Sequence, residues 1–225
     1  MLNKINFGVI GVGHLGKFHV QQLLNINLVN FIGVFDSNSS AVNKIDSVSS
    51  QQIFNDLNSL LSLCDAVSIV TPTSSHFDVA MKALGAGCHV FIEKPIANTV
   101  KEAEKIVSFS KKMNLKVQIG HIERFNPAYC EYLKMKPKPV FVESHRLAPF
   151  NVRGTDVAVI FDLMIHDIDL LINMIDSKII DIRASGACVV SNFVDLANAF
   201  ATMCRDIAFM AFDGPDEFYR VCRLR

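Results

Sequence analysis

The stretch Ile5-Asn6-Phe7-Gly8-Val9-Ile10-Gly11-Val12-Gly13-His14-Leu15-Gly16 decides the fold that we expect. The apolar run over residues 5–10 is typical of a buried strand, and helix formers follow over residues 14–25. Between them lies the pattern G-x-G-x-x-G, which gains meaning when it joins a strand to a helix. Gly11 permits a tight turn, Gly13 lets a pyrophosphate approach the backbone, and Gly16 lets the helix pack against the strand. The stretch therefore predicts a dinucleotide site.

An acidic residue follows the second predicted strand at the spacing that such a site requires. The run Phe31-Ile32-Gly33-Val34-Phe35 predicts that strand, and Asp36 comes directly after it, twenty positions beyond Gly16. A carboxylate there can accept hydrogen bonds from both ribose hydroxyls of NAD, and it would repel the 2′-phosphate of NADP. No arginine follows to compensate that charge. The sequence therefore predicts NAD as the cofactor.

Strands and helices alternate as far as residue 120. Further buried strands are predicted over residues 66–70, 89–92 and 117–119, with helices between them. This alternation indicates βαβ units and a parallel sheet that is covered on both faces. Prolines then punctuate the chain, and residues 140–145 alternate with period two, which predicts an exposed strand. We therefore place a domain boundary near residue 120.

The composition and net charge of the chain disfavour some classes of binding partner. Among 225 residues, 50% are hydrophobic, and 22 Lys and Arg balance 22 Asp and Glu. Chains that bind nucleic acid or membrane surfaces usually carry an excess of positive charge, and this chain has no such excess. No apolar run is long enough for a membrane span. The six cysteines are scattered without metal-ligand spacing, so we expect no metal site and a reducing, cytoplasmic location.

Three features indicate a catalytic site. Glu93-Lys94-Pro95 follows a predicted strand, where a lysine could stabilise a substrate oxygen that gains negative charge. In the predicted helix over residues 160–175, Asp162, His166, Asp169 and Asn173 share one face, so Asp162 could orient His166 as a base. Spacing alone does not distinguish that face from an ordinary solvated stripe. The third feature is the polar connector Gly120-His121-Ile122-Glu123-Arg124-Phe125-Asn126-Pro127. The alternative interpretation of this connector is an interdomain linker without a catalytic role.

Together these residues resemble the Gfo/Idh/MocA oxidoreductases. The matching pieces, in order and spacing, are Gly11-x-Gly13-x-x-Gly16-x-x-His19, Thr71-Pro72 with His76, Glu93-Lys94-Pro95, and Asp162-x-x-x-His166. The resemblance covers residues 4–198. Within the family, the connector and His145-Arg146-Leu147-Ala148-Pro149-Phe150 look most like bacterial sugar-nucleotide 3-dehydrogenases, which act on UDP-N-acetylglucosamine or its uronic acid in lipopolysaccharide biosynthesis.

The resemblance implies roles for individual residues. Lys94 would contact the sugar hydroxyl that is oxidised, His166 would remove its proton, and Asp162 would assist, while the sugar carbon gives a hydride to NAD. The implied cofactor-binding residues are Gly11, Gly13, His14, Leu15, Gly16, Asp36, Thr71, Pro72, His76, Glu93 and Lys94. The candidates for binding the substrate are Arg124, Asn126, Arg146 and Arg153, since a guanidinium can bind a diphosphate or carboxylate bidentately.

The resemblance also implies the second domain. We expect an N-terminal Rossmann doubly wound parallel sheet over residues 1–120, of class α/β. A partial substrate-binding and oligomerisation domain follows over residues 121–225, of class α+β, with a mostly antiparallel sheet. Residues 199–225 contain arginine but no lysine or asparagine, and they lack evident alternating strands. We interpret them as an atypical tail that is foreign to the family, by frameshift, gene-model error or junction.

Three functions remain open at this point. The leading one is an NAD-dependent dehydrogenase of a nucleotide-linked sugar, in a protein that would form homo-oligomers as its family does. The second is a dehydrogenase of a free sugar or an inositol-like polyol. The third is a truncated, non-catalytic NAD-binding module, which the short chain favours and the intact Lys94, Asp162 and His166 disfavour.

Overall fold

The computed structural model describes residues 4–42, 45, 47–147, 158–175, 177–189, 192, 194–203, 207–213 and 221–224. The chain divides into two compact units, Met1–Gly120 and His121–Arg225. Each unit has its own sheet and its own hydrophobic core, and each is described by itself below.

The first unit is built on a parallel sheet. Among the described residues its strands are β1 (Ile5–Ile10), β2 (Val29–Phe35), β3 (Ile53–Phe54), β4 (Ala66–Ile69), β5 (His89–Ile92) and β6 (Val117–Ile119). They lie in the order β3-β2-β1-β4-β5-β6, and every neighbouring pair is parallel. This is the strand order of a doubly wound dinucleotide-binding fold, so the predicted fold class is confirmed. Strand β3 was not predicted, because two residues give no periodic signal.

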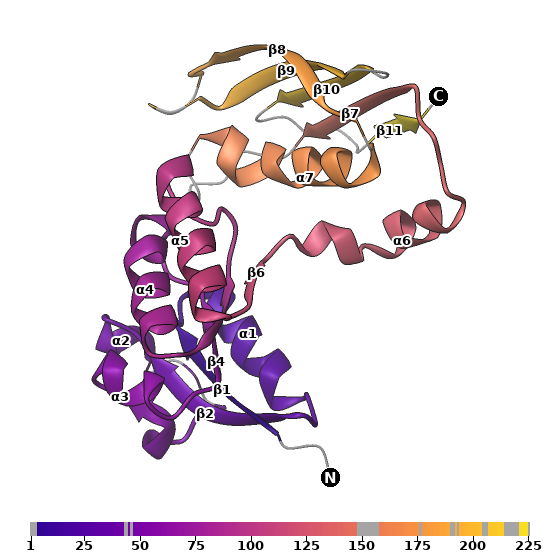
Figure 1. The fold of residues 1–225 in the computed structure, drawn as a ribbon. Helices are drawn as coiled ribbons and strands as arrows, with labels where there is room; N and C mark the ends of the chain where they lie inside the picture. Colours follow the sequence, from indigo (N-terminus) through magenta and orange to yellow (C-terminus); the bar gives the residue numbers. More distant parts are fainter. Residues whose placement is uncertain are drawn as a thin grey trace. The chain divides into compact units, whose positions relative to one another are not determined.

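Helices cover both faces of this sheet (Figure 1). They are α1 (His14–Leu24), α2 (Ser39–Val42), α3 (Leu57–Leu61), α4 (Thr73–Gly85) and α5 (Val100–Met113). Neighbouring residues of β1 enter different cores: Val9 packs with residues of α1 and α2, and Ile10 packs with residues of α3, α4 and α5. Alternate side chains of a strand point to opposite faces, so β1 is buried on both sides, as its continuous apolar run predicts.

The second unit combines short helices with a mixed sheet. After the turn η2 (Ile122–Phe125) come α6 (Pro127–Lys134), β7 (Phe141–Leu147), η3 (Ile160–Met164), α7 (Ile165–Met174), β8 (Ile179–Ala187), β9 (Leu196–Met203), β10 (Ile207–Asp213) and β11 (Val221–Leu224). The strand order is β11-β7-β10-β9-β8. Among the described strands of this second sheet only the β10–β7 pair is parallel, so the sheet is mostly antiparallel, as expected.

Two expectations about these strands are wrong. Strand β7 is not exposed: it lies between β11 and β10, and Val142 and Ser144 are buried on one face. Strands also occur within residues 199–225, where none was evident from the sequence. Along β9, Ala197, Ala199 and Ala201 are buried. Residues of the other face include leucine and phenylalanine, which hid the alternation on which strand prediction depends.

Helix α7 covers one face of this second sheet. Met164, Leu171 and Ile175 pack against Val142 of β7 and the buried residues of β9. The segment expected as one helix begins with a π-helical turn, η3, which contains Asp162. π-Helical turns are rare and often occur at functional sites. The sequence does not predict this turn, because the spacing of its apolar residues is typical of an α-helix.

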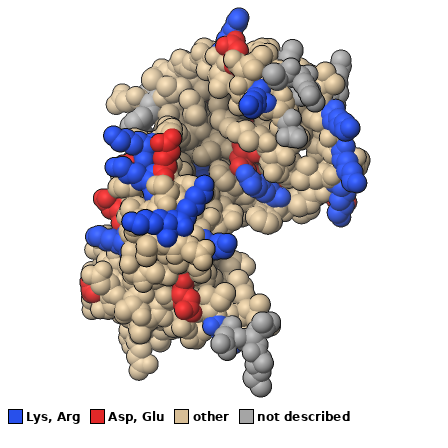
Figure 2. All heavy atoms as spheres, viewed as in Figure 1, with Lys and Arg blue, Asp and Glu red and all other residues tan. Residues whose placement is uncertain are grey.

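Charges of both signs are mixed on the visible surface. Figure 2 shows Lys and Arg side chains beside Asp and Glu side chains on the face drawn. Within the described part of the chain, no helix is both long enough and apolar enough to cross a membrane.

Candidate functional site

The glycine turn between β1 and α1 has the geometry of a phosphate-binding loop. Gly11 has φ +88°, and a Cβ there would lie 2.7 Å from the backbone of Val70 and Thr71. A Cβ on Gly16 would overlap the carbonyl oxygen of Gly11, so the helix can approach the turn only because this residue has no side chain. A Cβ on Gly13 would meet nothing within 4 Å. The backbone at Gly13 is therefore open to a ligand at the amino end of α1.

Asp36 lies beside this turn. One of its carboxylate oxygens accepts a hydrogen bond from the Val12 backbone N–H at 2.8 Å, and the other accepts one from the Asn38 N–H at 2.8 Å. The same side chain thus ties the end of β2 to the glycine turn. Each carboxylate oxygen has a second lone pair, which leaves capacity for ribose hydroxyls.

The segment after β4 is held by a buried histidine. Thr71 and Pro72 lie between β4 and α4, and His76 in α4 is only 1% exposed. Its Nε2 lies 2.8 Å from the Thr71 carbonyl oxygen, and its Nδ1 lies 2.8 Å from the Pro95 carbonyl oxygen. A carbonyl oxygen only accepts, so both contacts are hydrogen bonds only when the ring carries two protons. His76 therefore lies between the segment after β4 and the segment after β5 and contacts the backbone of both.

Lys94 follows β5, and the Lys94–Pro95 peptide bond is cis. The preceding Glu93 is held by His19 of α1, whose Nε2 lies 3.1 Å from Glu93 Oε1. Burial acts to raise the pKa of the Glu93 carboxyl, but the hydrogen bond and charge of His19 and the neighbouring Lys94 outweigh it and lower the pKa overall. The carboxylate beside Lys94 therefore stays ionised at neutral pH.

Asp162 and His166 belong to the second unit. Asp162 lies in η3 and His166 in the first turn of α7, both with partly buried side chains. Further along the expected face, Asp169 binds Arg124, and Asn173 donates a hydrogen bond to the Tyr129 hydroxyl at 2.9 Å. The C-terminal half of that face is thus used for packing against η2 and α6.

The expected substrate-binding arginines already have partners. Arg124 donates to both carboxylate oxygens of Asp169, at 2.7 and 2.6 Å, and this pairing raises the pKa of its guanidinium. Arg146 donates to both oxygens of Asp167, at 2.5 and 3.1 Å, and to Glu123 at 3.4 Å. Asn126 caps α6 through the Ala128 N–H. The fourth candidate, Arg153, lies outside the described residues.

The network around Arg146 was missed by the sequence analysis. The side chains of Arg146 and Asp167 are 12% and 11% exposed, and Ser144 also donates to Asp167. Because Asp167 is adjacent to His166 and lies between Asp162 and Asp169, nothing in the spacing singles it out as the buried acid. The network borders a cavity of about 260 Å³ that Tyr129 and Tyr132 also line.

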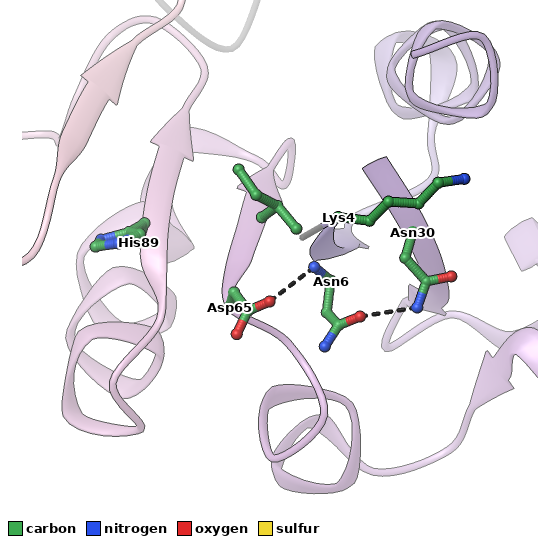
Figure 3. A pocket seen from close by; sticks show the side chains of 6 residues that line it. Lys4, Asn6, Asn30, Asp65 and His89 are labelled. Carbon is green, nitrogen blue, oxygen red and sulfur yellow. Dashed lines mark hydrogen bonds between the residues drawn. The ribbon is translucent and has the colours of Figure 1, made fainter. Parts of the chain in front are cut away.

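A further depression lies at the opposite, amino-terminal edge of the first sheet (Figure 3). Its volume is about 700 Å³, and its lining includes Lys4, Asn6, Asn30, Asp65 and His89. Asn6 N–H donates to Asp65, and Asn30 donates to the Asn6 side chain. These polar groups satisfy one another, and ligands of such sheets bind at the carboxyl edge. We assign no function to this depression.

The carboxyl edge of the first sheet fits a dinucleotide. The open backbone at Gly13 can receive a pyrophosphate, and Asp36 is placed for a ribose. Next to Gly11, the Thr71 Oγ1 atom is buried and has no hydrogen-bond partner within the described part of the chain. Such an atom is satisfied when a ligand supplies the missing partner. His14 and Leu15 begin α1 at the same edge, and their side chains are exposed.

Comparison with known proteins agrees with this geometry. Residues 5–121 match the Gfo/Idh/MocA family, described as an oxidoreductase family with an NAD-binding Rossmann fold. The chain belongs to this family, and its cofactor is NAD.

Individual relatives narrow the comparison. The chain is 42% identical over 198 residues to UDP-N-acetylglucosamine 3-dehydrogenase of Acidithiobacillus ferrooxidans, which covers 87% of this chain and 62% of that protein. A solved structure of that enzyme has a TM-score of 0.90 at 39% identity and covers 98% of this chain and 74% of its own. The NAD-dependent scyllo-inositol 2-dehydrogenase of Bacillus subtilis is 24% identical over 213 residues, covering 87% of this chain and 61% of that protein. The chain thus spans about three fifths of these curated relatives.

Proposed function

We propose that the protein is an NAD-dependent dehydrogenase that oxidises the C3 hydroxyl of a UDP-linked amino sugar. The observation that supports this most is the 42% identity to a UDP-N-acetylglucosamine 3-dehydrogenase, compared with 24% for an inositol dehydrogenase over a similar length. The proposal includes a place in lipopolysaccharide biosynthesis, a cytoplasmic location and a homo-oligomeric state.

In this proposal, the chain's own residues bind NAD and activate the hydroxyl. Gly11, Gly13 and Gly16 hold the pyrophosphate, and Asp36 selects the unphosphorylated ribose. When bound, NAD supplies an acceptor for a hydride. Lys94 donates a hydrogen bond to the substrate oxygen.

The proton of that hydroxyl goes to His166. An imidazole accepts a proton readily near neutral pH, so it suits the part of general base. Asp162, four residues earlier, orients the ring and stabilises its charged form.

A polyol dehydrogenase is the second candidate, and one observation favours it. Arg124 and Arg146, the residues expected to bind a diphosphate, are paired with Asp169 and with Asp167 and Glu123. Binding a diphosphate through them would require these pairs to open or to share their donors. A polyol has no such requirement.

The deciding experiment adds substrates to the purified protein with NAD and follows nicotinamide absorbance. The proposal predicts NADH formation with UDP-N-acetylglucosamine or its uronic acid, and much less with scyllo- or myo-inositol. Turnover of inositols alone would establish the second candidate. Tight NAD binding without turnover of any of these compounds would indicate a non-catalytic binding module. NADP in place of NAD is the matched control for the cofactor.

A further inference from the structure

The ring of His19 is held at both nitrogens, next to the segment that carries Lys94. Its Nδ1 is 2.7 Å from the Ser68 hydroxyl, and its Nε2 is 3.1 Å from Glu93 Oε1. Its ring contacts Phe91 edge-on, with centroids 5.6 Å apart. A carboxylate only accepts hydrogen bonds, so Nε2 carries a proton in this arrangement. Ser68 then completes the bonding of the ring at the other nitrogen.

Glu93 is confined on three sides. One oxygen bonds His19, and the other accepts the backbone N–H of Lys94 at 3.2 Å. On the third side is Gly120, where a Cβ would lie 2.8 to 2.9 Å from the Glu93 carboxyl atoms. These contacts restrict the carboxylate, and its hydrogen bond restricts the peptide at which the Lys94 side chain begins.

The other side of Lys94 is held as well. His76 Nδ1 lies 2.8 Å from the carbonyl oxygen of Pro95, so side chains contact the backbone at Lys94 itself and at the residue after it. A lysine side chain has much rotamer freedom, and fixing its backbone limits the positions that its ammonium can reach.

We propose that His19 and Glu93 are positioning residues that hold Lys94 for the reaction. In this proposal they act through Lys94 and not on the substrate itself. His19 fixes the Glu93 carboxylate, and the carboxylate fixes the Lys94 peptide and lies close to its charge. The inference rests on the proposed function, in which Lys94 contacts the substrate hydroxyl.

The test compares two substitutions of His19 that differ in reach. In His19→Gln, the side-chain N–H approximates Nε2 and can still bond Glu93. In His19→Asn, the shorter side chain loses that bond. Glu93→Ala removes the acceptor for the Lys94 N–H. The matched controls are His89→Asn, at the start of the same strand β5, and Glu104→Gln, an exposed acid of α5.

The first measurement is hydrogen exchange of the backbone amides, which does not depend on turnover. We expect faster exchange at Lys94 in His19→Asn and Glu93→Ala, confined to the neighbouring residues, and exchange close to wild type in His19→Gln and both controls. Unchanged exchange at Lys94 would overturn the proposal, and so would acceleration spread across the whole first unit, which would indicate a merely structural role.

The second measurement is steady-state kinetics with the substrate that the wild type oxidises. We expect kcat to fall roughly ten- to a hundredfold in His19→Asn and Glu93→Ala, with the KM for NAD nearly unchanged in His19→Asn and kcat largely recovered in His19→Gln. Wild-type kcat in His19→Asn would overturn the proposal. If the wild-type protein oxidises none of the substrates, the proposed function fails, and the exchange measurement alone decides the positioning of Lys94.

Discussion

Asp36 serves two neighbours at once. Its carboxylate joins the glycine turn to the end of β2 through Val12 and Asn38, and we propose that it also binds the ribose of NAD. In this proposal a single side chain sets both the shape of the turn and the preference for NAD over NADP.

Replacing Asp36 by Ala tests this double role. We expect NAD affinity to fall roughly tenfold or more, because hydrogen bonds to a charged group are lost, and discrimination against NADP to relax. Titration by NADH and NADPH fluorescence measures both effects. Asp56→Ala is the control, since Asp56 accepts a hydrogen bond from Ser59 at the start of α3, away from the turn. Unchanged NAD affinity in Asp36→Ala would remove Asp36 from the site.

The Glu93 carboxyl makes the stability of the first unit depend on pH. Its pKa is lowered from the ordinary value of 4.5, so folding favours its ionised form. The resulting stability is present above about pH 4.5 and is lost as the pH falls through the lower, folded-state pKa. Urea unfolding between pH 7 and pH 3 should therefore show a smaller loss of stability in Glu93→Gln than in the wild type. Equal slopes for the two proteins would contradict the lowered pKa.

The turn between β1 and α1 depends on one close contact between a helix and a strand end. Gly16 and Gly85 are both helical glycines, yet only Gly16 has backbone against its missing side chain. Gly16→Ala should destabilise the first unit by about 1–3 kcal/mol and weaken NADH binding. Gly85→Ala should be neutral or stabilising by up to about 1 kcal/mol, because alanine favours helix. Similar melting temperatures for the two variants would contradict this account.

Helix α7 and strand β7 are joined by a buried charge network. Arg146→Met should cost roughly 3–5 kcal/mol, because it leaves Asp167 buried without its cation. Arg146→Met combined with Asp167→Leu should recover most of that loss. Urea unfolding measures both. The exposed pair Lys134–Glu131 is the control, and Lys134→Ala should change stability by less than about 1 kcal/mol. A small effect of Arg146→Met would show that the network is solvated.

These elements show which features of the fold and the site the sequence predicts. The Rossmann sheet was predictable because glycine turn, buried strand and Asp36 are local signals in one short stretch. The partners of Arg124 and Arg146 were not, because each pairs with an acid in α7, more than twenty positions along the chain. Strand β9 was hidden by apolar residues on both of its faces. Whether the predicted site residues act as proposed stays a prediction.

For the protein as a whole, the proposal assigns Lys94 of the first unit and His166 of the second to a single hydroxyl. Residues that act together in one chemical step give losses that do not add when both are removed. The proposed function therefore predicts that the losses of activity caused by replacing Lys94 and His166 do not add.

The most direct test is the rate of nicotinamide reduction in Lys94→Ala, His166→Ala and the double variant, with NADH affinity measured in parallel. Each single change should reduce the rate roughly a hundredfold or more and leave NADH binding intact. The double variant should be little slower than the slower single variant. A wild-type rate in either single variant, or losses that multiply in the double variant, would contradict the account.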